Sequence, residues 1–147
     1  MIKIAVDRKD LSVLVSHTAA KAGVDKGEEL GIAVAVAVVD SASRLMAFLR
    51  APDAYTPSTR IAIDKASTAA GFRMESRALY ELVKESDAVL EGLRAQKEVA
   101  LFGGGVPVFL DGAVIGAIGV SGGSEEQDIE CAEASLAAIE KLAATAS

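Results

Sequence analysis

Lys65 is the residue whose position carries the clearest chemical implication. In the helix that the sequence predicts from Pro57 to about Phe72, the apolar stripe includes Ile61 and Ala69, and Lys65 falls within that stripe, four residues from each. A lysine at such a position extends its ammonium group to solvent, forms an internal ion pair or holds an acidic ligand, because an unpaired buried charge is costly. These alternatives stay open at the level of the sequence.

Glycine-rich segments at residues 103–107 and 111–123 are the second chemical feature. They are neither a P-loop nor a dinucleotide-binding turn, because no Gly-Lys-Ser/Thr follows and Gly116-x-x-Gly119 lies within a predicted strand. Ala117, Gly119 and Ser121 share one face of this strand, and their small size allows either a helix or a ligand to lie against the backbone. The N–H groups that follow open a helix and favour an anion, although acidic residues already stand there: Glu125, Glu126 and Asp128.

The chain has one histidine and one cysteine, His17 and Cys131. His17 lies about 120° from the centre of the apolar stripe of a helix predicted from Asp10 to about Gly27, so a single chain leaves it exposed. It is a surface residue, a residue at a subunit interface or the axial ligand of a haem iron. Cys131 is predicted to lie off the apolar stripe of the last helix, close to acidic residues that disfavour a thiolate.

Composition excludes several classes of protein. A net charge of −6 argues against nucleic acid or an anionic membrane as a partner, and 4% aromatic residues argue against base stacking. One histidine and one cysteine exclude the usual structural metal sites and an internal disulfide. The 147 residues predict a single domain, 1–147. The first residues show no secretory signal and the longest apolar run is too short to span a bilayer, so a cytoplasmic location is expected.

Hydrophobic patterning predicts the elements that position these residues. Strands are expected at 2–6, 32–40, 44–50, 106–110 and 113–120, with 32–40 apolar on both faces and therefore central. Asp40 ends this strand at a turn and has a structural role by default. Helices are expected at 10–27, 57–72, 75–94 in two pieces, and after a capping box formed by Ser124 and Gln127. Hairpins between helices predict an α+β domain, an antiparallel sheet of four to five strands packed by helices.

Three motifs together resemble a known family. They are Lys65-Ala-Ser-Thr-Ala-Ala-Gly-Phe72, then Gly104-Gly-Val-Pro-Val108, then the glycine pattern of residues 112–123 followed by Asp128. This combination resembles the GlcG/HbpS-like family, also called the haem-binding, glycolate-utilisation G family. That family is related to the C-terminal domain of the corrinoid adenosyltransferase of propanediol utilisation. The resemblance covers about residues 10–142.

The resemblance implies a profilin-like sheet, a homo-oligomer that is often an octamer, and haem or a related tetrapyrrole as the cofactor of some members. His17, the one histidine of the chain, is the candidate ligand for a haem iron. The predicted ligand-binding residues are those that match the family motifs: Lys65, Thr68, Gly104, Gly105, Pro107, Ser121 and Gly122.

Three functions follow from these observations. The first is a small-ligand binding protein, with haem as the named candidate. The second is a catabolic lyase or isomerase for a small carboxylic or aromatic acid, in which Lys65 orients the acid, Ser121 helps to hold an oxyanion, and Asp40 or Asp128 moves a proton. The third is an accessory assembly protein without catalysis.

Overall fold

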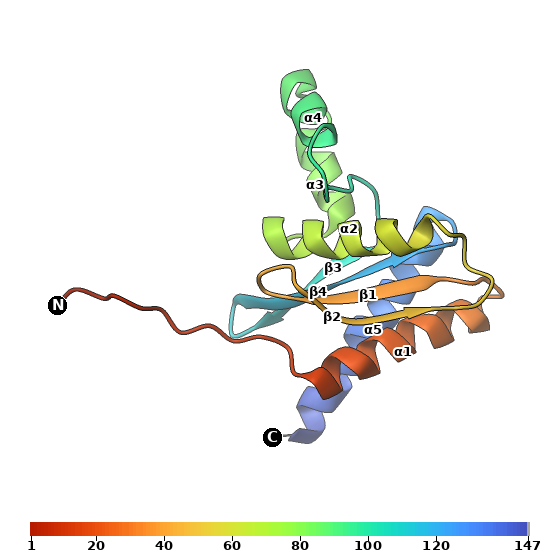
Figure 1. The fold of residues 1–147 in the computed structure, drawn as a ribbon, viewed down its shortest axis with the longest axis horizontal. Helices are drawn as coiled ribbons and strands as arrows, with labels where there is room; N and C mark the ends of the chain where they lie inside the picture. The colour runs from red at the N-terminus through yellow and green to blue at the C-terminus, as the bar shows by residue number, and fades with distance from the viewer. Residues whose placement is uncertain (147) are drawn as a thin grey trace.

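The computed structural model describes residues 1–146, and in this range four strands form one antiparallel sheet (Figure 1). Strand order is β2-β1-β4-β3, so β1 and β4 are central and β2 and β3 are edges. The elements follow one another as α1 (Val13–Glu29), β1 (Ala35–Asp40), β2 (Leu45–Arg50), α2 (Ser58–Phe72), α3 (Ser76–Val83), α4 (Asp87–Arg94), β3 (Gly105–Leu110), β4 (Ala113–Ser121) and α5 (Glu125–Ala146). The predicted α+β class is confirmed.

The sheet separates two apolar layers of different side-chain size. Valines of β1 such as Val36 and Val38 point toward α1 and α5, while Ala35 and Ala37 of the same strand point toward α2. Figure 1 shows this arrangement, with α2 on one face of the sheet and α1 and α5 on the other. Every residue of β1 is buried. The two-sided burial predicted for this strand is therefore confirmed.

Helix α2 lies unusually close to the sheet because glycine stands beneath it. A Cβ atom on Gly119 would lie 2.0 Å from the carbonyl oxygen of Ala62 and 2.5 Å from the nitrogen of Ala66. A Cβ atom on Gly105 would lie 2.3 Å from the carbonyl oxygen of Lys65. The sequence predicts either a helix or a ligand against the small-residue face of β4, formed by Ala117, Gly119 and Ser121. In the described chain, helix α2 lies there.

The N-terminal predictions need correction. Residues 2–6 form no strand and all of residues 1–10 are exposed. Helix α1 begins after Ser12, whose hydroxyl accepts a hydrogen bond from the Val15 N–H, and not after Asp10. Its buried face consists of small residues, whereas the larger apolar side chain of Leu14 is largely exposed. The buried residues of α1 are Ser16, Ala19, Ala20, Gly23 and Gly27.

The C-terminal helix begins as predicted. The Ser124 N–H donates to Gln127 Oε1, and the Gln127 N–H donates to Ser124 Oγ, which together form a capping box. Cys131, however, is fully buried against the sheet rather than placed off the apolar stripe. Burial, followed by the charge of Asp128, raises the pKa of its thiol to about 11. The low reactivity inferred from its acidic surroundings therefore has desolvation as its main cause.

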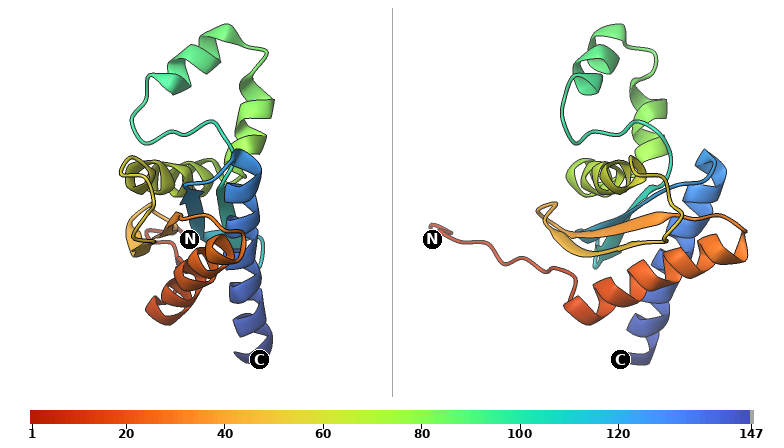
Figure 2. Two further views of the ribbon diagram at one scale, coloured as in Figure 1. Left: turned by 90° about the vertical axis from the view of Figure 1, so that its right-hand side faces the viewer. Right: turned by 45° about the vertical axis from the view of Figure 1, so that its right-hand side comes forward.

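Helices α3 and α4 project from the sheet body, as both views of Figure 2 show. The predicted division of residues 75–94 into two helical pieces is confirmed. Ser76 ties this projection to the sheet, because its hydroxyl donates to the Phe102 carbonyl and accepts from the Gly105 N–H.

The close approach of α2 yields a paired prediction. Gly119→Ala should lower the free energy of unfolding by at least about 2 kcal/mol, because the added methyl group overlaps helix backbone that has no room to move. Gly71 lies in α2 itself and has open space around its Cβ position. Gly71→Ala should therefore raise the free energy of unfolding by about 0.5–1 kcal/mol. Urea unfolding of both variants measures the difference. Equal effects of the two substitutions would contradict the packing described above.

Candidate functional site

The ammonium group of Lys65 is enclosed within the protein. The side chain is 0% exposed, and Nζ donates to Asp128 Oδ2 at 2.9 Å and to the Val120 carbonyl oxygen at 2.8 Å. The ring of Phe102 lies on a further side, with its centroid 4.5 Å from Nζ, within the range of a cation–π contact. Of the alternatives open for this lysine, the internal ion pair is the one found.

Asp128 is held between the lysine and the turn before α5. One carboxylate oxygen accepts from Lys65, and the other accepts the Gly123 N–H at 2.8 Å. Burial raises the pKa of Asp128, and the charge and hydrogen bond of Lys65 oppose this rise. Burial likewise lowers the pKa of Lys65, against the charge and hydrogen bond of Asp128. Each partner thus offsets the desolvation of the other.

Several predicted ligand-binding glycines form the wall around this pair. Gly104 has φ +124°, and a Cβ atom there would lie 2.6 Å from the Val120 carbonyl oxygen and 2.9 Å from Lys65 Nζ. Gly122 has φ +148°, with Ala33 backbone in the place of a side chain. Gly104 and Gly105 thus lie against Lys65, and Gly122 lies against the backbone of Ala33. A role of these glycines in ligand binding stays a prediction.

The remaining predicted residues have separate positions. Thr68 joins α2 to the loop before β3, because its hydroxyl donates to the Asp64 carbonyl and accepts the Ala100 N–H. Asp40 accepts the backbone N–H groups of Ala42 and Arg44 and pairs with the Arg44 side chain. The structural role expected of Asp40 agrees with these bonds.

Ser121, at the end of β4, and Asp40, at the end of β1, lie at opposite ends of the pairing between these two strands. Ser121 pairs with the first residue of β1, Ala35, and Asp40 is the last residue of β1. At about 3.3 Å per residue, five steps along the strand separate the two ends by about 16 Å. Asp128, at the Ser121 end, is thus the carboxylate that the fold brings to Lys65, and Asp40 is not.

His17 lies on the other face of the sheet from Lys65. It is exposed on α1, while Lys65 belongs to α2 (Figure 1). Among residues 1–146 its imidazole has no hydrogen-bond or ion-pair partner. Val13 and Leu14, four and three residues earlier, are exposed apolar side chains on the same side of the helix. One chain thus does not bring His17 and Lys65 to a common ligand.

An apolar groove was missed by the sequence analysis. It has a volume of about 570 Å³ and lies between the start of α1, strand β3 and the last turns of α5. Pro107 lines this groove, as do Leu14 and Val15, whereas Lys65 does not. Leu136 and Leu142 of the last helix, both only partly buried, were the available signal, but the groove also needs residues from distant segments of the chain.

No group of three or more metal-binding side chains occurs in residues 1–146. No helix in this range has the length and hydropathy needed to cross a membrane.

The buried pair carries a stability prediction. Lys65→Met should lower the free energy of unfolding by about 3–5 kcal/mol, because it leaves the Asp128 carboxylate buried without a counter-charge. The double variant Lys65→Met, Asp128→Leu should recover part of this loss, since no unpaired charge remains. Lys21→Met, an exposed lysine variant, is the control and should change stability by less than about 0.5 kcal/mol. Denaturant titration measures all three, and a Lys65→Met variant as stable as the control would contradict the pairing.

The fold and these contacts define an α+β protein with one helix on the small-residue face of a four-stranded antiparallel sheet and two helices on the other. A family model described as "Haem degrading protein HbpS-like" matches residues 11–137. The chain therefore belongs to this family, and the predicted GlcG/HbpS-like membership is confirmed.

Individual relatives agree with this assignment. The corrinoid adenosyltransferase PduO of Salmonella typhimurium is 37% identical over 125 residues, which are 84% of this chain and 37% of PduO. The chain thus spans little more than a third of that relative. The protein in the crystal structure of a PduOC:haem complex has 35% sequence identity to this chain. The two folds superpose with a TM-score of 0.81, over 88% of this chain and 94% of that one. The Klebsiella pneumoniae protein ORFY is 28% identical, with a TM-score of 0.88, covering 95% and 97% respectively.

Proposed function

We propose that this protein binds haem or a related tetrapyrrole within a homo-oligomer, with His17 as the ligand of the iron. The observation that carries the proposal is an exposed imidazole without an intramolecular partner, bordered by two exposed apolar side chains. Family membership and the haem complex of a relative that is 35% identical support it.

The residues around His17 fit the chemistry of a haem group. Haem requires an axial ligand for the iron and apolar contacts for the macrocycle. The free imidazole supplies the first, and Val13 and Leu14 supply part of the second. When bound, haem would add an iron centre capable of redox chemistry, while the chain's own residues position and shield it.

One chain covers only one side of such a ligand. Val13, Leu14 and His17 all lie on the exposed side of α1, so the outer side of a flat macrocycle would remain in water. A second copy that brings its own apolar surface to this helix would enclose it. This requirement supports the homo-oligomer, with the octamer implied by the family as its proposed form.

The alternative of a lyase or isomerase has no comparable support in residues 1–146. Its acid-orienting group, Lys65, is fully buried and already paired with Asp128. Binding of a small acid by Lys65, Ser121 and the surrounding glycines therefore stays a prediction from the sequence motifs.

Haemin titration tests the proposal. The wild-type chain should bind haemin with a shifted Soret band, and His17→Ala should weaken binding at least about tenfold and change the band, because the axial nitrogen is lost. Lys21→Ala, one turn further along the same helix and also exposed, is the matched control and should bind nearly as wild type.

Two outcomes would overturn the proposal in different ways. An identical Soret band for His17→Ala would remove the axial role of this residue. Failure of the wild-type chain to bind micromolar haemin would remove haem as the ligand and favour the accessory assembly protein instead.

A further inference from the structure

Residues 1–10, here called the arm, begin with a row of exposed apolar side chains. Figure 1 shows the arm extending away from the sheet and helices. Ile2, Ile4 and Val6 are 87%, 93% and 62% exposed. Because side chains alternate along an extended chain, these three share one face, opposite Lys3 and Ala5. Exposed aliphatic side chains in such a row mark an interaction site.

The direction of the arm is fixed where it leaves the body. The Leu11 N–H donates to the Ile115 carbonyl at 3.1 Å, and the buried Leu11 side chain packs over Gly116. Asp10 Oδ1 accepts the Ser41 N–H at 2.7 Å. These contacts fix Asp10, the last residue of the arm, and Leu11, which follows it.

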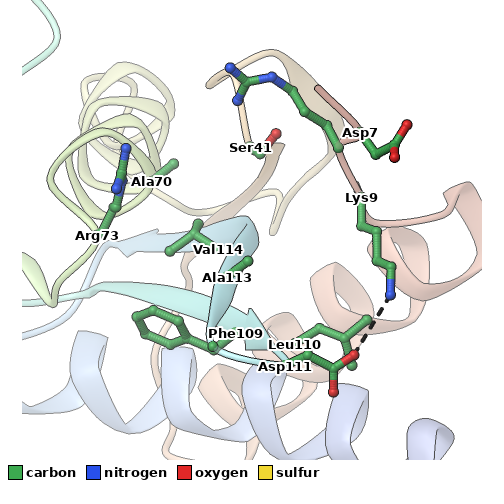
Figure 3. Close-up of a pocket in the computed structure, with 12 residues that line it drawn as sticks. Asp7, Lys9, Ser41, Ala70, Arg73, Phe109, Leu110, Asp111, Ala113 and Val114 are labelled. Atoms are coloured by element: carbon green, nitrogen blue, oxygen red, sulfur yellow. Dashed lines mark ion pairs between the residues drawn. The ribbon is translucent and has the colours of Figure 1, made fainter. Parts of the chain in front are cut away.

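Residues 7–9 then run along the β3–β4 hairpin rather than toward the apolar groove. They line a cavity of about 550 Å³ with hairpin residues 109–114, and Lys9 Nζ lies 3.6 Å from Asp111 Oδ2 (Figure 3). To reach the groove of its own chain, the arm would have to give up this contact and reverse direction next to the fixed Leu11.

The groove matches the arm in chemistry. Most of its lining is aliphatic, contributed by the start of α1, by residues 107–110 and by the last turns of α5. The edge of β3 offers little backbone pairing, because Pro107 lacks an N–H and the Gly105 N–H is taken by Ser76. Side-chain burial, rather than strand addition, would therefore provide the contact.

Charge and length also favour exchange between copies. Lys3, Arg8 and Lys9 against Asp7 and Asp10 give the arm a formal charge of +1, whereas the whole chain carries −6, leaving −7 for the rest. Asp10, the last residue of the arm, and the adjacent Leu11 both line the groove. Nine extended residues reach about 30 Å, enough to cross a two-fold axis that passes near this rim.

We propose that the arm of one copy docks its Ile2, Ile4 and Val6 face into the apolar groove of a second copy of this chain, and that the exchange is reciprocal. The contact does not involve His17 and does not depend on haem binding, although Leu14 borders both the groove and the proposed haem contact.

Crosslinking between two variants that each carry one added cysteine tests where the arm lies. An Ile4→Cys copy is mixed with a size-tagged Ala143→Cys copy and treated with a short bismaleimide. Cys131 remains in place, because it is fully buried and its thiol pKa is raised to about 11. Docking predicts a crosslinked species containing one copy of each. Ala137→Cys, on the same helix but outside the groove, replaces Ala143→Cys as the control and should give at least about fivefold less of this product.

Sedimentation equilibrium tests what the arm contributes. Ile4→Asp should weaken self-association at least tenfold, whereas Ala5→Asp, which adds the same charge on the opposite face, should change it less than twofold. The proposal is overturned if Ile4 crosslinks to Ala143 only within a doubly substituted chain, if Ile4→Asp associates as wild type, or if the wild-type chain is monomeric at all concentrations.

Discussion

A buried charge pair beside the end of β4 constrains how three elements of this protein dock. Lys65 comes from the middle of α2, its carbonyl partner Val120 from the end of β4, and Asp128 from the first turn of α5. The pair therefore ties together both faces of the sheet, because α2 and α5 lie on opposite sides. Leaving either partner alone in this interior would cost several kcal/mol, so the three elements must dock in one register.

This constraint also explains why motifs typical of a ligand site form a packed interior here. Glycine at 104, 105 and 119 allows backbone to approach α2 where any side chain would collide. The same pattern would suit a ligand lying across the strand, which is why the sequence left both options open. In the described chain the space belongs to a helix, while the groups that we propose to bind haem lie on α1.

Much of the fold could be predicted from local patterns. The two hairpins, the division of residues 75–94 and the capping box of α5 depend on neighbours along the chain, and all were predicted. The strand expected at residues 2–6 was wrong, because alternation indicates a strand only where a partner strand exists. The buried faces of α1 and of the helix with Cys131 were also predicted wrongly from side-chain hydrophobicity. The residues buried there are small, because α1 and α5 pack closely against each other.

The site was harder to predict for a related reason. That Lys65 sits on a buried stripe was visible in its spacing, but the identity of its partner depends on contacts 55 and 63 residues away. The apolar groove likewise draws on three distant segments.

The contrast between the two layers of the sheet has a consequence for how such sequences diverge. On the α2 side, Gly105 and Gly119 lie so close to the helix backbone that no side chain fits at either position, although the same layer also holds Val39. These two glycine positions are therefore closed to substitution. On the α1 and α5 side, valine, leucine and isoleucine can replace one another where the total volume of the core is kept. Evolution can thus reshape the surface that meets ligands or other chains while the layer with the lysine remains the same.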